Sequence, residues 1–334
     1  MVPRLMPVAR QGVPEAGAAP LAGSAHVWFR EMADADDPAR LIETIDPAAR
    51  ERFSAPRPPL FGHPLDRPLI MGILNVTPDS FSDGGDHADE RAAVAGAVRM
   101  SECCDILDIG GESTRPGAEA VPEAEEIRRT APVIRAIREA GIATPISIDT
   151  RKSAVAAAAL DAGADMINDV AAGRFDPAIL SLAAERGVPI CLMHSVADPK
   201  TMQAHARYDD VLGEVYDHLG ERMASAVAAG VAPDHIILDP GIGFGKTAQH
   251  NLTLLRGLTL YHGLGGALLI GASRKRFIGE IGKADAAKDR MAGSVAVALY
   301  AADQGAHILR VHDTFETRQA LSLHLAFHER GSGA

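Results

Sequence analysis

The chain contains little of what marks disulfide-rich, membrane or nucleic-acid-binding proteins. Only three of its 334 residues are cysteines, and Cys103, Cys104 and Cys191 lack the spacing of a disulfide framework or a zinc site. No apolar run reaches the roughly 18 residues that a membrane-spanning helix needs. Prolines and polar residues interrupt the amino-terminal segment. We therefore predict no signal peptide and expect a cytoplasmic location.

Positive charge is also scarce. The formal net charge is −11, whereas a nucleic-acid-binding protein needs a basic face, so we expect neither a nucleic-acid nor a membrane partner. An acidic chain can still bind a small anion where a few cationic side chains gather. A hydrophobic content of 47% is typical of a globular protein with a sizeable core.

The first 60 residues differ in composition from the rest. Residues 11–25 are rich in alanine, proline and glycine, which is typical of a poorly ordered tail. Trp28 is the only tryptophan, and residues 41–53 resemble a short helix. We predict an N-terminal extension over residues 1–60, partly disordered or packed on the remainder, and a single domain over residues 61–334.

From about residue 68, apolar segments of strand length alternate with segments of helical composition. The first covers residues 68–76, the last covers residues 306–312, and about eight can be counted. Near-continuous apolar strands separated by helices indicate a parallel sheet covered on both faces. Eight such units predict a (β/α)8 TIM barrel of the α/β class. An open, doubly wound sheet is the alternative.

Polar side chains end or follow every one of these predicted strands. In chain order they are Asn75; Glu112 to Arg115; Asp149; Asn168 and Asp169; His194; Asp239; Ser273 to Lys275; and Arg310 with His312. In a parallel barrel the carboxyl ends of the strands share one face, where active sites are built. One such residue alone can be a helix cap, but polar groups at all the strand ends indicate a common pocket.

These strand-end groups fall into two sectors. One sector offers acceptor oxygens suited to a heterocycle rich in N–H donors, from Asp149, Asn168 and Asp239. The other lies on the seventh and eighth strands, the usual phosphate sector of this fold, and contains Lys275, Arg310 and His312. Asn75 adds a neutral oxygen that, beside a phosphate-rich ligand, could bind a Mg²⁺ ion that keeps most of its waters.

Seven segments occur in an order that resembles a known family. They are MGILNVTPDSFSDGG, GESTRPGA, SIDT, IND, DPGIGFGKT, GASRKRFIG and RVHD. Together they closely resemble the dihydropteroate synthases, from about residue 68 to the last predicted helix. The resemblance implies a transferase of folate synthesis. Such an enzyme condenses 6-hydroxymethyl-7,8-dihydropterin pyrophosphate with para-aminobenzoate to give 7,8-dihydropteroate and pyrophosphate.

The resemblance also implies roles for individual residues. The pterin ring would be held by Asp149, Asn168, Asp239 and Lys275, in a site lined by Met193 and Phe244. The pyrophosphate would be held by Arg310, His312 and Asn75, with Mg²⁺ as the cofactor on Asn75. Loops that complete the aminobenzoate pocket would contain Phe81, Thr114, Arg115 and Pro116. The expected catalytic residues are Asp149, Lys275, Arg310 and His312, and Ser273 and Arg276 are further expected substrate contacts.

One position departs from the family pattern. Many members have serine after the lysine of the SRK segment, where it helps bind the aminobenzoate carboxylate, but this chain has Arg276. An arginine can bind a carboxylate at least as well. Members are usually dimeric through the last barrel helices, so we expect a homodimer, and sulfonamides are expected to bind the aminobenzoate pocket.

The implied mechanism is a dissociative substitution without a covalent nucleophile. Pyrophosphate would leave first, and the arylamine would then attack a cation delocalised into the pterin ring. A methyltetrahydrofolate-dependent methyltransferase is an alternative, but it has no need of the pyrophosphate sector formed by Arg310 and His312. A non-catalytic pterin-binding homologue is a second alternative. A purely structural barrel would leave the convergent strand ends unexplained.

Overall fold

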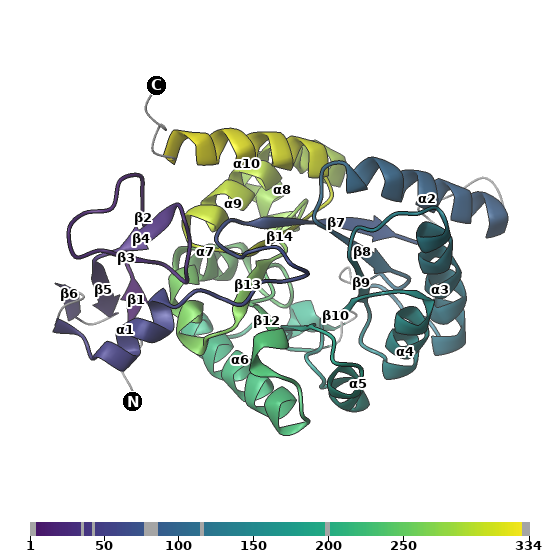
Figure 1. Cartoon of the computed structure of the whole chain (residues 1–334), viewed down its shortest axis with the longest axis horizontal. Helices are drawn as coiled ribbons and strands as arrows, with labels where there is room; N and C mark the ends of the chain where they lie inside the picture. The colour runs from purple at the N-terminus through teal and green to yellow at the C-terminus, as the bar shows by residue number, and fades with distance from the viewer. Residues whose placement is uncertain are drawn as a thin grey trace.

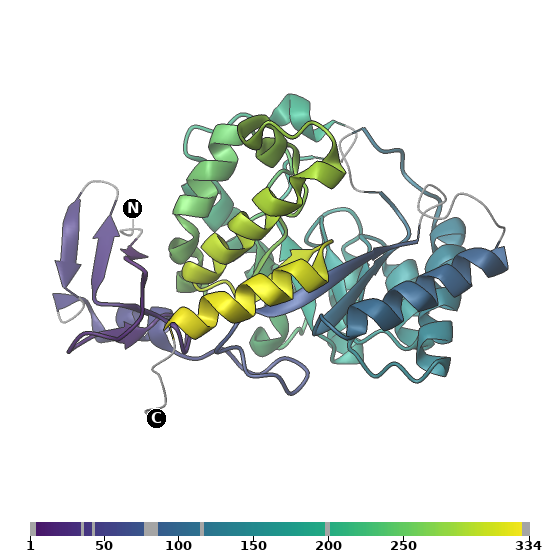
Figure 2. The same ribbon diagram turned by 90° about the horizontal axis from the view of Figure 1, so that it is seen from above.

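The dominant feature of the computed structural model is a closed barrel of parallel strands (Figures 1 and 2). The structure describes residues 5–34, 37–41, 44–76, 86–113, 117–197 and 201–328. The barrel strands are β7 (Leu69–Asn75), β8 (Ile106–Gly110), β9 (Ile146–Asp149), β10 (Met166–Asp169), β11 (Ile190–Met193), β12 (Ile236–Asp239), β13 (Ala267–Ile270) and β14 (Ile308–Val311). They pair in chain order, and β14 closes onto β7. The predicted TIM barrel is confirmed.

Helices connect the strands and cover the outside of the barrel. They are α2 (Asp86–Ser101), α3 (Glu123–Glu139), α4 (Ser153–Ala162), α5 (Ala178–Arg186), α6 (Val211–Ala228), α7 (Ala248–Arg256), α8 (Arg276–Gly282), α9 (Met291–Asp303) and α10 (Thr314–His328), with short 3-10 helices that include η5 (Leu258–Leu264). Alternate strand residues such as Ile109, Ile148 and Leu192 belong to the main buried cluster. Of the helices within the described ranges, none has the length and apolar character needed to cross a membrane.

The remaining alternate positions point into the barrel, and their character changes along the strands. Near the amino ends they are apolar, and Met71, Ile106, Met166, Ile237 and Ile308 form a second buried cluster. Successive side chains of a strand alternate between its two faces, so the residue two places later also points inward. On four of these strands that next inward residue is polar or charged: Asp108, Asn168, Asp239 and Arg310. The interior is therefore apolar at the amino end and charged at the carboxyl end.

The residues before the barrel form two small antiparallel sheets and one helix. One sheet contains β1 (Met6–Pro7), β5 (Glu31–Asp34) and β6 (Asp37–Leu41), the other contains β2 (Arg10–Gln11), β4 (Val27–Phe29) and β3 (Ala19–Pro20), and the helix is α1 (Pro47–Ser54). Figure 1 shows them at one side of the barrel, where α1 and β1 contact η5. Within residues 11–25, where composition predicted a poorly ordered tail, Leu21 is buried and packs in a cluster with Phe29 and Phe53. A domain division at residue 60 stays a prediction.

Candidate active site

The carboxyl ends of the strands bring the predicted acceptor residues to one end of the barrel. Asp149, the last residue of β9, lies in register with Asn168 of β10. Met193, the last residue of β11, lies in register with Asp239, the last residue of β12. All four side chains are buried. They lie at the end of the barrel where parallel strands of this fold present their active sites.

Arg310 of β14 forms ion pairs with two carboxylates across the interior. Its Nε donates to Oδ2 of Asp108 over 2.6 Å, and its Nη2 donates to Oδ2 of Asp149 over 2.6 Å. The amide Nδ2 of Asn168 lies 3.3 Å from the same oxygen of Asp108. Side chains from β8, β9, β10 and β14 thus form one connected network. In this structure Arg310 lies among the acceptors, so the two sectors predicted from the sequence meet.

Asp108 is a member of this network that the sequence reasoning missed. It lies within β8, two residues before the strand ends, and its side chain is fully buried. A signal was available, because Asp108 is a charged residue inside the otherwise apolar segment ILDIGG. A buried carboxylate needs a charged or hydrogen-bonding partner. Asp108 is two residues after Ile106 and so points into the barrel as Ile106 does. Its partner therefore comes from another barrel strand.

Asp149 keeps one of its oxygens available. Its Oδ2 accepts from Arg310, but its Oδ1 is buried without a hydrogen-bond partner among the described residues. Burial raises the pKa of Asp149 to about 7, with Arg310 opposing the rise and Asp108 adding to it. A buried acceptor without a donor costs roughly 1–3 kcal/mol. The site therefore offers an acceptor that an N–H group of a ligand can satisfy.

Asp239 is held by the glycine-rich loop that follows β12. Its Oδ1 accepts from the backbone N–H of Gly241 over 2.7 Å. Gly241 has a φ of +69°, and a Cβ at this position would lie 1.9 Å from the carbonyl oxygen of His194. Only glycine fits there. Burial raises the pKa of Asp239 to about 6, while the Gly241 hydrogen bond and then Lys275 lower it.

Lys275 lies against an apolar wall at the rim of the barrel. Its Nζ is 3.8 Å from the centroid of the Phe244 ring, a position in which the aromatic face stabilises a cation. Phe244 packs in a small buried cluster with Met193 and Met202. The loop approaches closely because Gly243 has no side chain, and a Cβ there would lie 2.9 Å from Cδ of Lys275. The lysine is thus held beside residues expected to line a ring.

His312 follows β14 and is oriented by Ser273. The Ser273 Oγ accepts from the backbone N–H of His312 over 3.2 Å and lies 3.1 Å from Nδ1 of the ring. Since Oγ already accepts one hydrogen bond, its O–H can donate to Nδ1, which leaves the ring proton on Nε2. Burial, followed by Arg310, lowers the pKa of His312 to about 3. At neutral pH the ring is therefore a neutral N–H donor.

Three other strand-end residues bind neighbouring loops. Asp169 accepts from two backbone N–H groups of the turn that follows it, over 2.8 and 2.6 Å. Glu112 accepts from Lys152 Nζ over 2.6 Å. His194 Nδ1 lies 2.9 Å from Lys246 Nζ, which also donates to two carbonyl oxygens of the glycine-rich loop. Lys246 was not predicted, and its contacts fix the loop that holds Asp239.

Of the remaining predicted residues, the structure describes Arg276 and Asn75. The Arg276 side chain is 86% exposed and pairs with Glu280 over 2.7 Å. Asn75 is the last residue of β7 and is half-buried. Four predicted residues lie outside the described part of the chain: Phe81, Thr114, Arg115 and Pro116.

Comparison with known proteins shows the family of the chain. A family model described as pterin binding enzyme matches residues 71–312. A dihydropteroate synthase of Neisseria meningitidis serogroup C is 51% identical over 262 residues, which are 77% of this chain and 92% of the relative. This chain belongs to the dihydropteroate synthase family of pterin-binding enzymes. The resemblance seen in the sequence segments is confirmed, and the family match begins after the N-terminal extension.

Solved structures of dihydropteroate synthases have the same fold. A Xanthomonas albilineans dihydropteroate synthase with 4-aminobenzoic acid superposes with a TM-score of 0.75 at 48% identity and covers 80% of this chain and 95% of its own. The Xanthomonas albilineans enzyme in complex with 7,8-dihydropteroate gives a TM-score of 0.72 at 46% identity, with the same coverage. A Yersinia pestis dihydropteroate synthase with a sulfonamide drug complex gives 0.74 at 44% identity.

Proposed function

We propose that this chain is a dihydropteroate synthase that condenses 6-hydroxymethyl-7,8-dihydropterin pyrophosphate with para-aminobenzoate. The observation that carries the proposal is the unpartnered, buried Oδ1 of Asp149 in a network with Arg310 at the carboxyl end of the barrel. Relatives of this name cover most of the chain, and similar structures hold 4-aminobenzoic acid and 7,8-dihydropteroate. The reaction is a transfer of the pterin methylene group from pyrophosphate to the arylamine.

The pterin ring would occupy the acceptor end of the barrel interior. Asp149 Oδ1 and the second oxygen of Asp239 would accept from ring N–H groups, and Asn168 offers a neutral amide beside them. Lys275 would approach the ring over the face of Phe244. Carboxylates facing the ring favour positive charge on it. They would therefore stabilise the cation that forms when pyrophosphate leaves.

The leaving pyrophosphate would lie toward β14. Arg310 would donate to its oxygens, with His312 adding a neutral N–H whose orientation Ser273 fixes. Arg310 already neutralises Asp108 and Asp149, so binding an anion requires it to share its donors. An arginine has five N–H donors and can serve several acceptors at once. This sharing couples occupation of the ring site to binding of the pyrophosphate.

A magnesium ion fits the side-chain oxygen of Asn75, at the carboxyl end of the first barrel strand. Asn75 offers one half-buried neutral oxygen at the end of β7, which suits an ion that takes its other ligands from water and phosphate oxygens. When bound, Mg²⁺ would neutralise charge on the leaving pyrophosphate. The residues of this chain would position the pyrophosphate, with Asn75 on one side and Arg310 on the other.

We also infer a homodimer formed through the last two barrel helices. Several large apolar side chains of α9 and α10 are exposed, namely Met291, Tyr300, Phe315, Leu323 and Phe327. Exposed large apolar side chains on neighbouring helices are what an interface between two copies would cover. A molecular mass in solution twice that of the 35.1 kDa chain would agree with this inference. A cytoplasmic location stays a prediction.

One assay tests the proposed reaction. The purified full chain is incubated with Mg²⁺, the pterin pyrophosphate and para-aminobenzoate, and both pyrophosphate and dihydropteroate are measured. We expect stoichiometric products and inhibition by a sulfonamide that competes with para-aminobenzoate. Binding of the pterin without product would instead indicate the non-catalytic homologue. Turnover of methyltetrahydrofolate in place of the pyrophosphate substrate would indicate the methyltransferase.

A further inference from the structure

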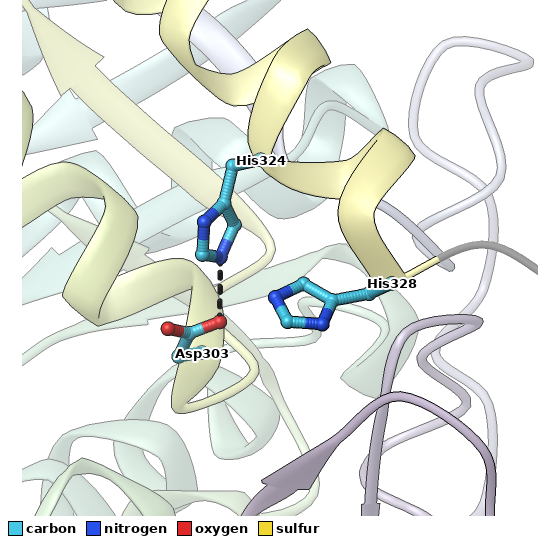
Figure 3. Close-up of side chains that lie close together, drawn as sticks. All are labelled: Asp303, His324 and His328. Carbon is cyan, nitrogen blue, oxygen red and sulfur yellow. Dashed lines mark hydrogen bonds and ion pairs between the residues drawn. The ribbon is translucent and has the colours of Figure 1, made fainter.

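Three metal-ligating side chains meet away from the active site, where the last two helices of the barrel end. His324 and His328 lie on α10, and Asp303 is the last residue of α9; Figure 3 shows both rings directed toward the carboxylate. One ligand atom from each residue lies within 4.8 Å of the other two. The Nε2 of His324 is 2.7 Å from Oδ1 of Asp303, and the two rings are 4.9 Å apart. Among the described residues, this is the one such group of three.

The arrangement has the chemistry of a transition-metal site. Histidines four residues apart lie on the same face of a helix, which is how helical zinc sites present two imidazoles. A carboxylate as the third ligand is common for Zn²⁺, which takes nitrogen and oxygen ligands at about 2.0–2.2 Å. We propose that Asp303, His324 and His328 bind a Zn²⁺ ion. On binding, Nε2 of His324 would take the metal and the ring proton would sit on Nδ1, reached by exchange with solvent, so that the ring stays neutral.

His26 of the N-terminal extension, which lies outside this group of three, is tested as a fourth ligand. Its side chain is 6% exposed, and its Nε2 has no hydrogen-bond partner among the described residues. Its Nδ1 lies 3.0 Å from Oγ of Ser24. The backbone of Ala302, next to Asp303, lies close to the His26 ring. The unpartnered Nε2 of His26 is the atom that would take the metal.

The position of the site indicates a structural role. Helix α9 precedes β14 and α10 follows it, so the end of α9 and the end of α10 both lie at the amino end of the barrel, opposite the active site. Gln11 of β2 donates from Nε2 to the carbonyl oxygen of Asp303 over 2.8 Å. A metal ion held also by His26 would link the extension to the last two helices, and would stabilise the folded chain by an amount that rises with the logarithm of the free metal concentration above its Kd.

Cobalt provides a direct test with the full-length protein. Metal-free protein is titrated with Co²⁺, whose visible absorption reports a tetrahedral site, and then with Zn²⁺, which is expected to displace it. We expect one tight site per chain and a rise in the midpoint of thermal unfolding when Zn²⁺ is added. Titration without a visible band, together with no change in the unfolding midpoint, would refute the proposal.

Variants separate a metal ligand from an ordinary hydrogen bond. His324→Gln keeps an N–H donor for Asp303 but removes the imidazole, and His328→Ala removes the second ring. Each should lower the affinity for Zn²⁺ by more than about 100-fold, because even loss of a supporting hydrogen bond costs roughly 10- to 100-fold. His235→Ala, in a histidine outside the cluster, is the matched control and should bind Zn²⁺ normally.

The other outcomes of these experiments also distinguish a metal site from a hydrogen bond between helices. Wild-type affinity in His324→Gln and His328→Ala would show that the cluster is only an interhelical hydrogen bond. His26→Ala should weaken Zn²⁺ binding and change the cobalt spectrum, and an unchanged spectrum would remove His26 from the ligand set. Dihydropteroate formation with Mg²⁺ present should be the same in all of these variants at low temperature, so failure of this proposal is distinguishable from failure of the proposed reaction.

Discussion

Asp149→Asn is the change that most directly tests the proposed active site. The wild-type carboxylate places one oxygen on Arg310 Nη2 and leaves the other, buried and unpartnered, for the ligand. Both carboxylate oxygens of Asp149 therefore face N–H donors, one from Arg310 and one from the bound pterin. An asparagine has one acceptor oxygen and one donor NH₂ group, so it cannot serve both. In the variant, an N–H group must face either Arg310 or the ring of the pterin.

The structure sets the size of the expected effect. Truncating one partner of a buried, hydrogen-bonded charge pair costs about 2–5 kcal/mol. At 1.36 kcal/mol for each factor of ten, this is a loss of roughly 30- to 5,000-fold in kcat/KM for the pterin substrate. Arg310 keeps Asp108 as a partner, so we expect the barrel to remain folded and the loss to appear in function.

Steady-state kinetics with both substrates measures the loss, and thermal unfolding checks the fold. The matched control is Asp165→Asn. Asp165 pairs with Arg138 over 2.5 Å and immediately precedes β10, at the opposite end of the barrel. This variant loses a charge pair without touching the site, so its kcat/KM should stay within about twofold of the wild type. A kcat/KM for Asp149→Asn within about threefold of the wild type would contradict our assignment of Asp149.

Further predictions concern the residues around Asp149. Lys275→Ala should lower kcat/KM by about 30-fold or more, by the same 2–5 kcal/mol, and wild-type kinetics would exclude it from the site. Gly243→Ala forces an alanine into a φ of +83° against Lys275, at a strain of about 1–2 kcal/mol; we expect a raised KM for the pterin, measured at fixed aminobenzoate. Asn75→Ala should raise the Mg²⁺ concentration needed for half-maximal activity, and an unchanged metal titration would count against this ligand. Asp239→Asn tests a pH effect. Folding raises the pKa of Asp239 from 3.8 to about 6, so its contribution to stability is full below about pH 4 and lost as the pH rises through 6. The free energy of unfolding of the variant, relative to wild type, should therefore rise between pH 4 and 6 in denaturant titrations, and a flat difference would contradict the shift.

The barrel itself could be predicted from the sequence because its determinants are local. Each strand is an apolar segment such as residues 68–76, each is followed by a helical segment, and eight repeats of this pattern close a barrel. The positions of Asp149, Asp239 and His312 at strand ends follow from the same pattern. The family could be recognised from seven sequence segments that occur in order, and the family model and the relatives confirm it.

Partners inside the barrel could not be predicted in the same way. Arg310 binds Asp108 and Asp149, which are 202 and 161 residues away along the chain. Which inward side chains meet depends on the stagger of the strands around the closed barrel, and no single segment records it. Asp108 was missed for this reason. The pKa values of Asp149 and Asp239 likewise depend on burial, which arises only when all the strands and helices are in place.

The sequence by itself determined the order of the elements, the closed parallel barrel and the residue types at its carboxyl end, because hydrophobic periodicity and strand-end chemistry are local properties. Only the tertiary structure decided that Arg310 lies among the acceptors, that Lys246 fixes the glycine-rich loop, and that Asp303 meets two histidines of α10 beside the N-terminal extension. These contacts join segments far apart in the chain, and their energies depend on distance and burial, which the folded chain alone defines.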